Sequence, residues 1–499
     1  MTEYDERPPV AQRDRRLAER RRLFFDDVAE QHARPGPFKR YYYRRLERLI
    51  RFHVPEGSRV IDIGCGVGDL LAALKPSRGL GVDFSGEMIR TARERHGDEE
   101  TLEFSVADAG ELELDERFDF VLLSNVVGDL VDVQRVLSRV PALCHERTRV
   151  IVTHFNYLWS PLVKLAERFG LKPRQREQNW LELYDLENLF ELAGLETIQS
   201  GRDMLVPVEI PLVTDLVNDT LGTLPGLSRF SVNEYVMGRA PQRPTRDRAA
   251  TDHAVSVIVA CKDERGNIEE LVRTVPRMGR GTELIFVDGH SADGTVEEIE
   301  RCIAAREQLN PDLDDVRVLV QPGKGKGDAV RAGFADARGQ VLMILDADIT
   351  VRPEDLPKFY DALVGDRGEF INGSRLVYPM EDQAMRFLNM LGNHFFGRVF
   401  TWLLDQRLTD TLCGTKVLYK SDYEAIERGR AFFGDFDPFG DFDLLFGAAK
   451  LGLRIREVPI RYRNREYGDI KIDRFRHGLL LLEMSALAFR RFKRLEGVA

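Results

Sequence analysis

Short apolar runs alternate with amphipathic segments along most of the chain, and many of the runs end in glycine or aspartate. Runs of this length predict buried strands, and the amphipathic segments between them predict helices. This alternation is typical of parallel α/β architecture. The predicted strands of the first half are 60–64, 79–84, 102–108, 118–125 and 149–155, and those of the second half are 255–261, 283–288, 316–321, 341–348 and 371–375.

A polar stretch from Arg239 to Ala254 separates the two sets of strands. It contains two prolines and has no hydrophobic periodicity, which is typical of a linker. We therefore expect two α/β domains, at 1–240 and 254–471, joined by a linker at 241–253, with a separate C-terminal segment at 472–499.

The bulk composition agrees with two domains, because 499 residues exceed what one hydrophobic core usually organises. A net charge of −10 argues against a general nucleic-acid-binding protein. The five scattered cysteines favour a reducing compartment, and the charged N-terminus lacks the apolar core of a signal peptide. Since no segment reaches the ~20 apolar residues of a membrane span, we predict a cytoplasmic protein.

Two carboxylates with one alanine between them follow the apolar run Val341–Leu345. In a strand, Asp346 and Asp348 would point to the same face. Like charges held so close raise each other's pKa unless a cation lies between them. The pair is either a divalent-metal site or the solvated turn at the end of a strand.

A glycine-rich turn, GCGVG at 64–68, follows the first predicted strand and precedes a predicted helix. Its spacing differs from the G-x-G-x-x-G pattern of dinucleotide-binding proteins. The next strand ends at Asp83, where a carboxylate can accept both hydroxyls of a ribose. Four successive strand ends with polar residues predict a crevice at the carboxyl edge of the sheet.

These features resemble class I S-adenosylmethionine-dependent methyltransferases over residues 40–200, and so imply a Rossmann-like sheet. The resemblance implies that S-adenosylmethionine binds to Asp62, Gly64, Gly66, Gly68, Asp83, Phe84, Asp108, Ala109 and Asn125. Within that set, the glycines would line the methionine portion, Asp83 would hold the ribose, and Asp108 with Ala109 would meet the adenine. Asn125 would lie near the transferring methyl group.

No catalytic base is predicted for this half of the chain. Methyl transfer can proceed by alignment of the reactants in a dry site alone. In addition, the chain has Val127-Gly128 where methyltransferases that act on small molecules often have bulkier or histidine-containing residues. Alternatively, this half of the chain binds S-adenosylmethionine but does not catalyse methyl transfer.

The second predicted domain combines acidic strand ends with a basic glycine loop. The loop GKGKG at 323–327 is either a diphosphate cradle or a flexible surface loop. The two aspartates of the DAD run follow it. A nucleotide diphosphate bridged to the protein by Mg²⁺ or Mn²⁺ would explain this order, because magnesium usually binds one or two carboxylates plus phosphate oxygens.

From about 253 to 475 the chain resembles family 2 glycosyltransferases with the GT-A fold, and among them the polyprenyl-phosphate sugar transferases. The matching segments include CKDERGNI, VDGHSADGT, GKGKGDAVRAGF, DADIT, NGSR and TDTLCGTKVLYK. The resemblance implies a metal at Asp346 and Asp348, and a GDP- or UDP-linked sugar as donor. Its implied nucleotide-sugar and phosphate contacts are Lys262, Glu264, Asp288, Lys324, Lys326, Arg375 and Lys416.

The chain departs from the family pattern at VDGHS, where the family usually has VDDGS. His290 in this turn is either a metal ligand or an ordinary turn residue. We expect inverting transfer by direct displacement. A lipid phosphate acceptor needs no general base, since its second pKa is about 6, whereas a hydroxyl acceptor needs one. Asp410 and Asp441 are then the candidates, with Asp443 a weaker one, unless all three are turn or cap residues.

Apolar residues of the C-terminal segment recur every three or four positions, at 472, 475, 479, 482, 486 and 489, which predicts an amphipathic helix. From Arg454 onward there are twelve Lys or Arg against six Asp or Glu. A helix with basic flanks suits the anionic inner face of the cell membrane, although it could also dock on the protein's own sheet or on a partner.

Two functions remain open. In the first, a bifunctional enzyme methylates one substrate and transfers a sugar to a polyprenyl phosphate at the membrane surface. In the second, the glycosyltransferase acts on a soluble or glycan acceptor, and the N-terminal half binds S-adenosylmethionine without turnover.

Overall fold

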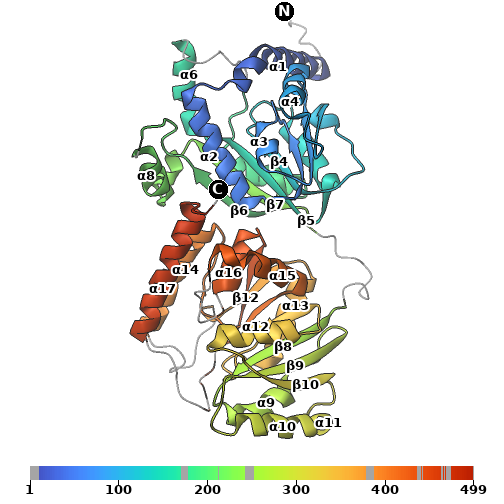
Figure 1. The fold of residues 1–499 in the computed structure, drawn as a ribbon, viewed down its shortest axis with the longest axis vertical. Helices are drawn as coiled ribbons and strands as arrows, with labels where there is room; N and C mark the ends of the chain where they lie inside the picture. The colour runs from blue at the N-terminus through green and yellow to red at the C-terminus, as the bar shows by residue number, and fades with distance from the viewer. Residues whose placement is uncertain are drawn as a thin grey trace, which may run out of the picture. The chain divides into compact units, whose positions relative to one another are not determined.

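A computed structural model describes residues 10–169, 178–211, 213–241, 252–377, 387–434, 440, 442–461, 463, 465, 467 and 474–497. The chain divides into two compact units, Met1–Gln242 with Lys493–Ala499 and Arg243–Phe492. Each unit contains one seven-stranded sheet (Figure 1). The predicted linker, 241–253, falls almost wholly outside the described residues.

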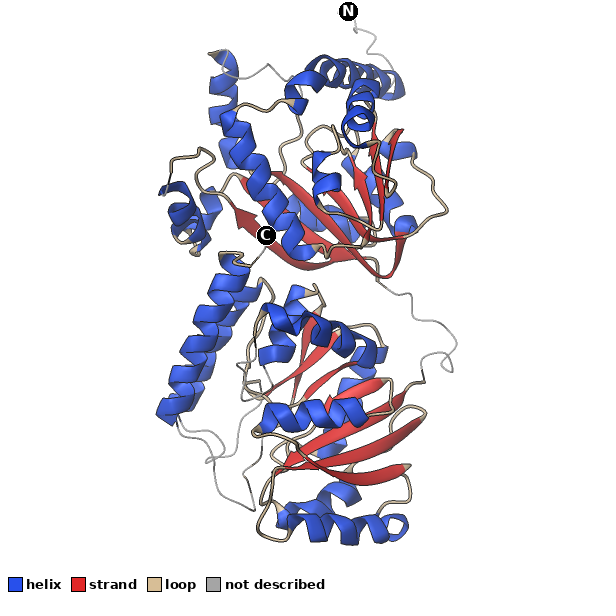
Figure 2. Ribbon diagram, viewed as in Figure 1, coloured by secondary structure: helices blue, strands red, loops and turns tan. Residues whose placement is uncertain are grey.

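The sheet of the first unit has the strand order β3-β2-β1-β4-β5-β7-β6. Its strands are β1 (Arg59–Ile63), β2 (Arg78–Asp83), β3 (Leu102–Val106), β4 (Phe118–Ser124), β5 (Cys144–Phe155), β6 (Glu196–Asp203) and β7 (Asn233–Arg239). Its helices are α1 (Val10–Ala33), α2 (Pro37–His53), α3 (Asp69–Ala73), α4 (Gly86–His96), α5 (Val133–Arg139), α6 (Ser160–Arg168), α7 (Leu183–Leu192) and α8 (Val213–Asp219). Helices pack against the sheet of each unit (Figure 2).

The sheet of the second unit has the strand order β10-β9-β8-β11-β13-β12-β14. Its strands are β8 (Ala254–Cys261), β9 (Gly281–Asp288), β10 (Asp315–Val320), β11 (Val341–Ile344), β12 (Phe370–Ser374), β13 (Lys416–Tyr419) and β14 (Ile455–Pro459). Its helices are α9 (Arg265–Thr274), α10 (Thr295–Ala304), α11 (Arg306–Leu309), α12 (Lys326–Asp336), α13 (Leu356–Val364), α14 (Phe387–Leu404), α15 (Lys420–Gly429), α16 (Phe442–Lys450) and α17 (Arg474–Ala488).

The predicted fold class, two α/β domains, is confirmed, but both sheets are mixed rather than purely parallel. In the first unit, β7 runs antiparallel to β5 and to β6. In the second unit, β13 runs antiparallel to β11 and to β12. Ten strands were predicted from the sequence, and four of the observed strands, β6, β7, β13 and β14, were not. Whether such a short segment becomes a strand depends on its partners in the sheet more than on its own periodicity.

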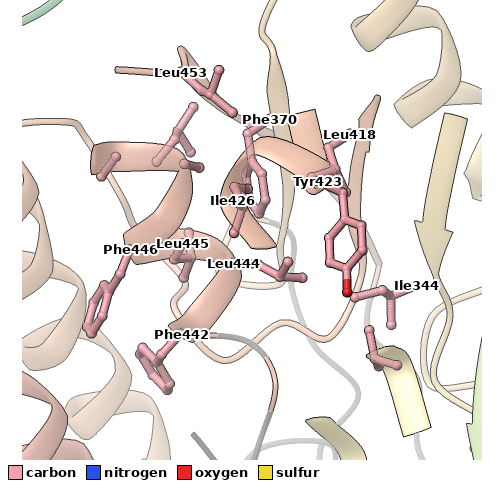
Figure 3. Close-up of a cluster of buried hydrophobic side chains, with 14 of the residues drawn as sticks. Ile344, Phe370, Leu418, Tyr423, Ile426, Phe442, Leu444, Leu445, Phe446 and Leu453 are labelled. Carbon is pink, nitrogen blue, oxygen red and sulfur yellow. The ribbon is translucent and has the colours of Figure 1, made fainter. Parts of the chain in front are cut away.

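The hydrophobic core of each unit lies on both faces of its sheet. In the second unit, one face of β11, β12 and β13 packs against α15 and α16, where Ile344, Phe370 and Leu418 meet Tyr423, Ile426 and Phe446 (Figure 3). Burial of such side chains contributes roughly 1.5–3 kcal/mol each. The strands are held by this packing, so their polar carboxyl ends are positioned by a rigid support.

The C-terminal helix α17 begins at Arg474 and ends at Ala488, and a π-helical turn, Phe489–Lys493, follows it. It packs against α14 (Figure 1). Its buried residues are Leu481, Met484 and Ala488, which differ from the apolar face predicted by periodicity. Among the described helices, none is long and apolar enough to cross a bilayer.

Candidate active sites

The glycine-rich turn of the first unit joins β1 to α3, and all three of its glycines have a left-handed backbone. The φ angles of Gly64, Gly66 and Gly68 are 81°, 53° and 80°. A Cβ at Gly64 would lie 2.5 Å from Val126, whereas a Cβ at Gly66 would meet nothing within 4 Å. Gly66 therefore leaves open space beside the turn, as a ligand-binding turn requires.

Two buried carboxylates stand at this turn, as predicted. Asp83 accepts hydrogen bonds from the backbone N–H of Gly66 at 3.0 Å and of Ser85 at 2.9 Å. Burial raises the pKa of Asp83 to about 6, and burial together with the charge of Asp83 raises the pKa of Asp62 to about 7. Oδ1 of Asp62 has no hydrogen-bond partner among the described residues. These acceptors fit the hydroxyl and amino groups of S-adenosylmethionine.

Helix α1 packs over this turn, and the sequence analysis assigned it no role. Its Val28 and Ala29 pack against Val67 and Met88. The Ser85 hydroxyl donates a hydrogen bond to Asp26 at 2.5 Å. The resemblance used for the sequence analysis began at residue 40, so α1 carried no motif that could have revealed this contact.

Other α1 contacts reach two further parts of the predicted pocket. The ring of Phe25 meets the ring of Phe84, with 5.8 Å between the centroids. Arg21 donates a hydrogen bond to the backbone oxygen of Asp129 at 2.8 Å. The helix therefore closes the cofactor crevice on one side.

The remaining predicted cofactor residues follow β3 and β4. Asp108 caps a short 3₁₀ turn that begins at Ala109, by accepting from the Gly110 N–H at 2.7 Å. Asn125 has a φ of 55° and accepts a hydrogen bond from the Tyr42 hydroxyl at 2.9 Å. All the predicted cofactor residues lie on β1, at its turn, or at or just beyond the carboxyl ends of β2–β4, at one edge of the sheet.

The second candidate site lies at the carboxyl edge of the other sheet. Strands β8 to β11 are mutually parallel, and β12 and β14 run in the same direction. The antiparallel strand β13 starts at this edge with Lys416. The topology therefore brings together five predicted site residues that lie at or beyond the carboxyl ends of β8 to β12. They are Glu264, Asp288, Lys326, Asp346 and Arg375.

Asp346 is surrounded by cations. Its Oδ1 lies 2.7 Å from Nζ of Lys326. Burial disfavours the charged carboxylate, but Lys326, Lys416 and Arg375 outweigh burial and hold the pKa of Asp346 below its usual range. Lys416 is fully buried and donates to the Cys413 carbonyl at 2.6 Å.

The pKa of Asp348 is shifted in the opposite direction to that of Asp346. Burial, and then the neighbouring Asp346, raise the pKa of Asp348 above its ordinary value. Its Oδ1 accepts from the Thr350 hydroxyl at 2.7 Å, and its Oδ2 lies 3.7 Å from Nη2 of Arg465. A divalent cation would relieve the repulsion between Asp346 and Asp348.

Arg465, which lies shortly after β14, was not among the residues predicted from the sequence. The same Nη2 lies 2.5 Å from Oε1 of Glu264, whose other oxygen accepts from Asn267 at 2.8 Å. Arg465 therefore links the predicted nucleotide contact Glu264 to the predicted metal ligand Asp348.

The remaining nucleotide contacts divide into buried and exposed residues. Asp288 is buried, accepts from the Ser291 N–H at 3.1 Å, and has no partner for Oδ1 in the described part of the chain. Lys262 and Lys324 are exposed. His290 is exposed with a φ of 59°, which fits a turn residue.

The candidate bases have different surroundings. Asp410 is fully buried and forms a bidentate pair with Arg375, with Nε at 2.7 Å and Nη2 at 2.8 Å. Burial opposes its charge, but Arg375 holds the pKa of Asp410 below its usual range. Asp443 pairs with Arg430 at 2.8 Å, and Asp441 lies outside the described residues. These contacts favour a supporting role for Asp410.

Gly414 makes room for the Asp346 carboxylate. A Cβ at this position would lie 2.1 Å from Oδ2 of Asp346. Among the described residues, no three His, Cys, Asp or Glu side chains form a metal-binding group. A site of two carboxylates completed by phosphate oxygens fits this arrangement.

Two family descriptions match the chain. "Methyltransferase domain" matches residues 15–200, and "Glycosyl transferase family 2" matches residues 256–425. The protein is a transferase whose C-terminal half belongs to glycosyltransferase family 2. As a whole, the chain is a family 2 glycosyltransferase fused to an S-adenosylmethionine-dependent methyltransferase domain, which confirms both predicted resemblances.

Curated relatives match the C-terminal half. A dolichyl-phosphate hexose transferase of Haloferax volcanii is 30% identical over 225 residues, which are 45% of this chain and 89% of that protein. A dolichol-phosphate mannosyltransferase of Saccharomyces cerevisiae is 40% identical over 114 residues, which are 22% of this chain and 40% of that protein. The chain thus spans less than half of the yeast enzyme.

Solved structures resemble the first unit. A methyltransferase of Haloferax volcanii in complex with the activator Trm112 is 22% identical with a TM-score of 0.36, covering 44% of this chain and 98% of that one. An S-adenosylmethionine-dependent methyltransferase of Thermotoga maritima is 20% identical with a TM-score of 0.36, covering 44% of this chain and 99% of that one.

Proposed function

We propose that the C-terminal half transfers a sugar from a nucleotide sugar to a polyprenyl phosphate, and that the N-terminal half transfers a methyl group from S-adenosylmethionine. The observation that carries the first activity is the group of three cations, Lys326, Lys416 and Arg375, around Asp346. The similarity to a dolichol-phosphate mannosyltransferase and a dolichyl-phosphate hexose transferase supports the same acceptor class.

The cations suit a reaction between two phosphate-bearing substrates. The diphosphate of the donor and the phosphate of the acceptor are both anionic, and fixed positive charges stabilise charge that develops between them. Lys326 stands at the first residue of α12, where free backbone N–H groups also favour phosphate. Asp346 and Asp348 would hold the divalent cation, whose charge would stabilise the departing diphosphate.

A phosphate acceptor also explains why the described site needs no general base. A phosphate monoester carries at least one negative charge at neutral pH and can attack the anomeric carbon directly. Asp410, the buried candidate base, already forms an ion pair with Arg375. We therefore propose direct displacement with inversion, in which Asp410 orients Arg375 toward a phosphate.

The C-terminal helix supports contact with a membrane surface. Leu479 and Leu482, on the predicted apolar face of α17, are 61% and 53% exposed. Arg490 and Arg494 follow this face. An exposed apolar stripe with basic flanks suits an anionic bilayer, where a polyprenyl phosphate resides.

The first unit would supply the methyl transfer. Asp62, Asp83 and the open space at Gly66 would hold S-adenosylmethionine, whose positively charged sulfur makes its methyl group reactive. The protein's part is to orient the cofactor and exclude water, and α1 would close the crevice on one side.

The test is to incubate the full chain with Mn²⁺, a panel of GDP- and UDP-sugars and a short polyprenyl phosphate, and to measure organic-soluble glycolipid. We expect a product that disappears in Asp348→Asn and persists in the matched control Asp312→Asn, an exposed aspartate. Nucleotide-sugar binding without a glycolipid would contradict the lipid acceptor and favour a soluble or glycan acceptor.

A further inference from the structure

Three polar residues lie in line across the antiparallel part of the first sheet. His154 of β5 is directly opposite Glu234 of β7, and Glu234 is directly opposite Arg202 of β6. Residues that are directly opposite in an antiparallel pair project from the same face. Nε2 of His154 lies 3.2 Å from Oε2 of Glu234, and Nε of Arg202 lies 2.7 Å from Oε1 of Glu234.

His154 and Glu234 of this row are buried, Arg202 is partly exposed, and their charges are compensated. His154 and Glu234 are 4% and 3% exposed. Burial disfavours the glutamate anion, but His154 and Arg202 hold the pKa of Glu234 below its ordinary value. An ionised Glu234 favours a proton on the nearer imidazole nitrogen, Nε2. The lone pair of a neutral imidazole is then on Nδ1.

Neither imidazole nitrogen of His154 forms a hydrogen bond in the described part of the chain, and neither does Oε2 of Glu234, so the 3.2 Å approach of Nε2 to Oε2 is a close contact rather than a well-aligned hydrogen bond. His154 lines a cavity of about 30 Å³, together with Asn125, Phe155, Asn179 and Trp180. A buried nitrogen without a partner carries an energetic penalty, so a ligand that donates a hydrogen bond would stabilise it. The cavity is large enough for a water-sized polar group.

The position of the cavity ties it to the methyl-transfer site. Asn125 lines the cavity and also follows β4 at the carboxyl edge where the cofactor residues gather. Asn179 closes the cavity by donating to the carbonyls of Val127 and Leu130 at 3.1 and 2.7 Å. The cavity and the predicted cofactor crevice therefore share one wall.

We propose that His154 is the general base of the methyl-transfer reaction, and that this cavity receives the O–H or N–H group that is methylated. The proposal rests on the proposed methyltransferase function. The acceptor atom gives its proton to Nδ1 of His154 and forms a bond to the methyl carbon. The carbon–sulfur bond breaks, its electron pair remains on the sulfur, and the imidazolium later releases the proton to water.

Glu234 is the positioning residue in this proposal, because it holds the imidazole through Nε2 and stabilises its protonated form. Charged groups around His154 come from three elements. They are Glu234 on β7, Arg202 on β6, and Asp129, which lines the cavity from the loop after β4. Tyr157 interacts electrostatically with Glu234.

The test is ¹⁵N NMR of the full chain labelled at histidine, with His154→Gln used to assign the His154 signals. We expect a neutral imidazole protonated at Nε2 at pH 8. Addition of S-adenosylmethionine should shift the ¹⁵N resonances of His154, because the sulfonium is a cation nearby. S-adenosylhomocysteine, whose sulfur is neutral, should shift them less.

His145 provides an internal control on the same strand. It lies at the other end of β5, with Nε2 3.0 Å from Oδ1 of Asp119, and its signals should not respond to either compound. An imidazole protonated at Nδ1, or an imidazolium that persists at pH 9, would overturn the proposal. If S-adenosylmethionine changed no resonance of the protein, the methyltransferase function itself would fail instead.

The role of Glu234 has its own readout. Glu234→Gln removes the negative charge but keeps the shape, so the Nε2-protonated form of His154 should lose its dominance. An unchanged tautomer would contradict the positioning role. The wild-type measurement stands independently of whether this variant folds.

Discussion

Nζ of Lys326 lies 2.7 Å from Oδ1 of Asp346, so the basic glycine loop and the DAD run, which the sequence separates by twenty positions, form one ion pair. The loop opens α12, and the carboxylate follows β11. The pair explains how Lys326 can keep the half-buried carboxylate of Asp346, the proposed metal ligand, ionised.

Removal of Lys326 should impair sugar transfer strongly. In Lys326→Met, the pKa of Asp346 should rise, and the acidic limb of the pH–rate profile should move to higher pH. We expect kcat/KM for the nucleotide sugar to fall by roughly 100-fold or more. The control is Lys358→Met, which changes an exposed lysine of α13 that pairs with Asp355. A profile identical to that of the wild type would contradict the role of the ion pair.

Gly414→Ala should disturb the metal site without removing a polar group. Its Cβ would lie 2.1 Å from Oδ2 of Asp346, so the carboxylate must move. We expect the Mn²⁺ concentration for half-maximal activity to rise at least about tenfold, equal to about 1.4 kcal/mol. Gly429→Ala is the matched control, since nothing lies within 4 Å of a Cβ there. Equal metal dependence in both variants would count against the assigned site.

Arg375→Met should destabilise the second unit, because it leaves Asp410 buried without its cation. The expected loss in the free energy of unfolding is about 3–5 kcal/mol, measured by denaturant titration. Arg375→Met combined with Asp410→Asn should recover part of that loss. A lysine at 375 should restore little, because it cannot reproduce the bidentate contact. Full stability of Arg375→Met alone would refute this account.

The buried carboxylates of the first unit should make its stability depend on pH. The pKa of Asp62 is raised to about 7, from an ordinary value near 4 in the unfolded chain. Between these values the folded state binds more protons than the unfolded state, so stability falls as pH rises from about 4 to 7. Asp62→Asn should remove much of this slope and stabilise the ligand-free protein at pH 8, by at most about 4 kcal/mol. Urea titrations at pH 5 and pH 8 would measure it, and a steeper slope in the variant would be the contrary result.

Binding to membranes should depend on α17. Leu479→Ser with Leu482→Ser should weaken co-sedimentation with vesicles that contain anionic phospholipid, because two exposed apolar side chains are lost. Added salt should weaken the binding of the wild type through its basic residues. Tyr184→Ser, a change at an exposed aromatic residue of the first unit, is the control. Unchanged sedimentation of the double variant would exclude α17 as the contact.

The sequence located ten of the strands, because a buried apolar run followed by glycine or aspartate is a local signal. The predicted strand 341–348 was too long, since β11 ends at Ile344 and both Asp346 and Asp348 lie in the turn that follows it. The sequence also placed Asp83, Asp346 and Lys326 in the correct segments. It did not find Arg465, whose contacts with Glu264 and Asp348 join segments more than one hundred residues apart. It did not find His154, because a lone histidine in an apolar strand has no local feature that separates a base from a core residue.

The C-terminal helix was predicted as an element, but its packing face was not. Periodicity selected the stripe that contains Leu479 and Leu482, whereas the structure buries the stripe of Leu481, Met484 and Ala488. A helix with two apolar stripes does not reveal from its own sequence which of them meets the core. The choice depends on α14, which supplies the complementary surface.

The sequence by itself determined the two α/β domains, ten of their strands, and the residue types that follow those strands. These follow from local periodicity and turn chemistry, which act over a few residues. Only the tertiary structure decided which strand ends share an edge, which cations surround Asp346, and which histidine faces a cavity. Those relationships depend on strand pairing between distant segments, which is set by packing and register rather than by any single stretch of residues.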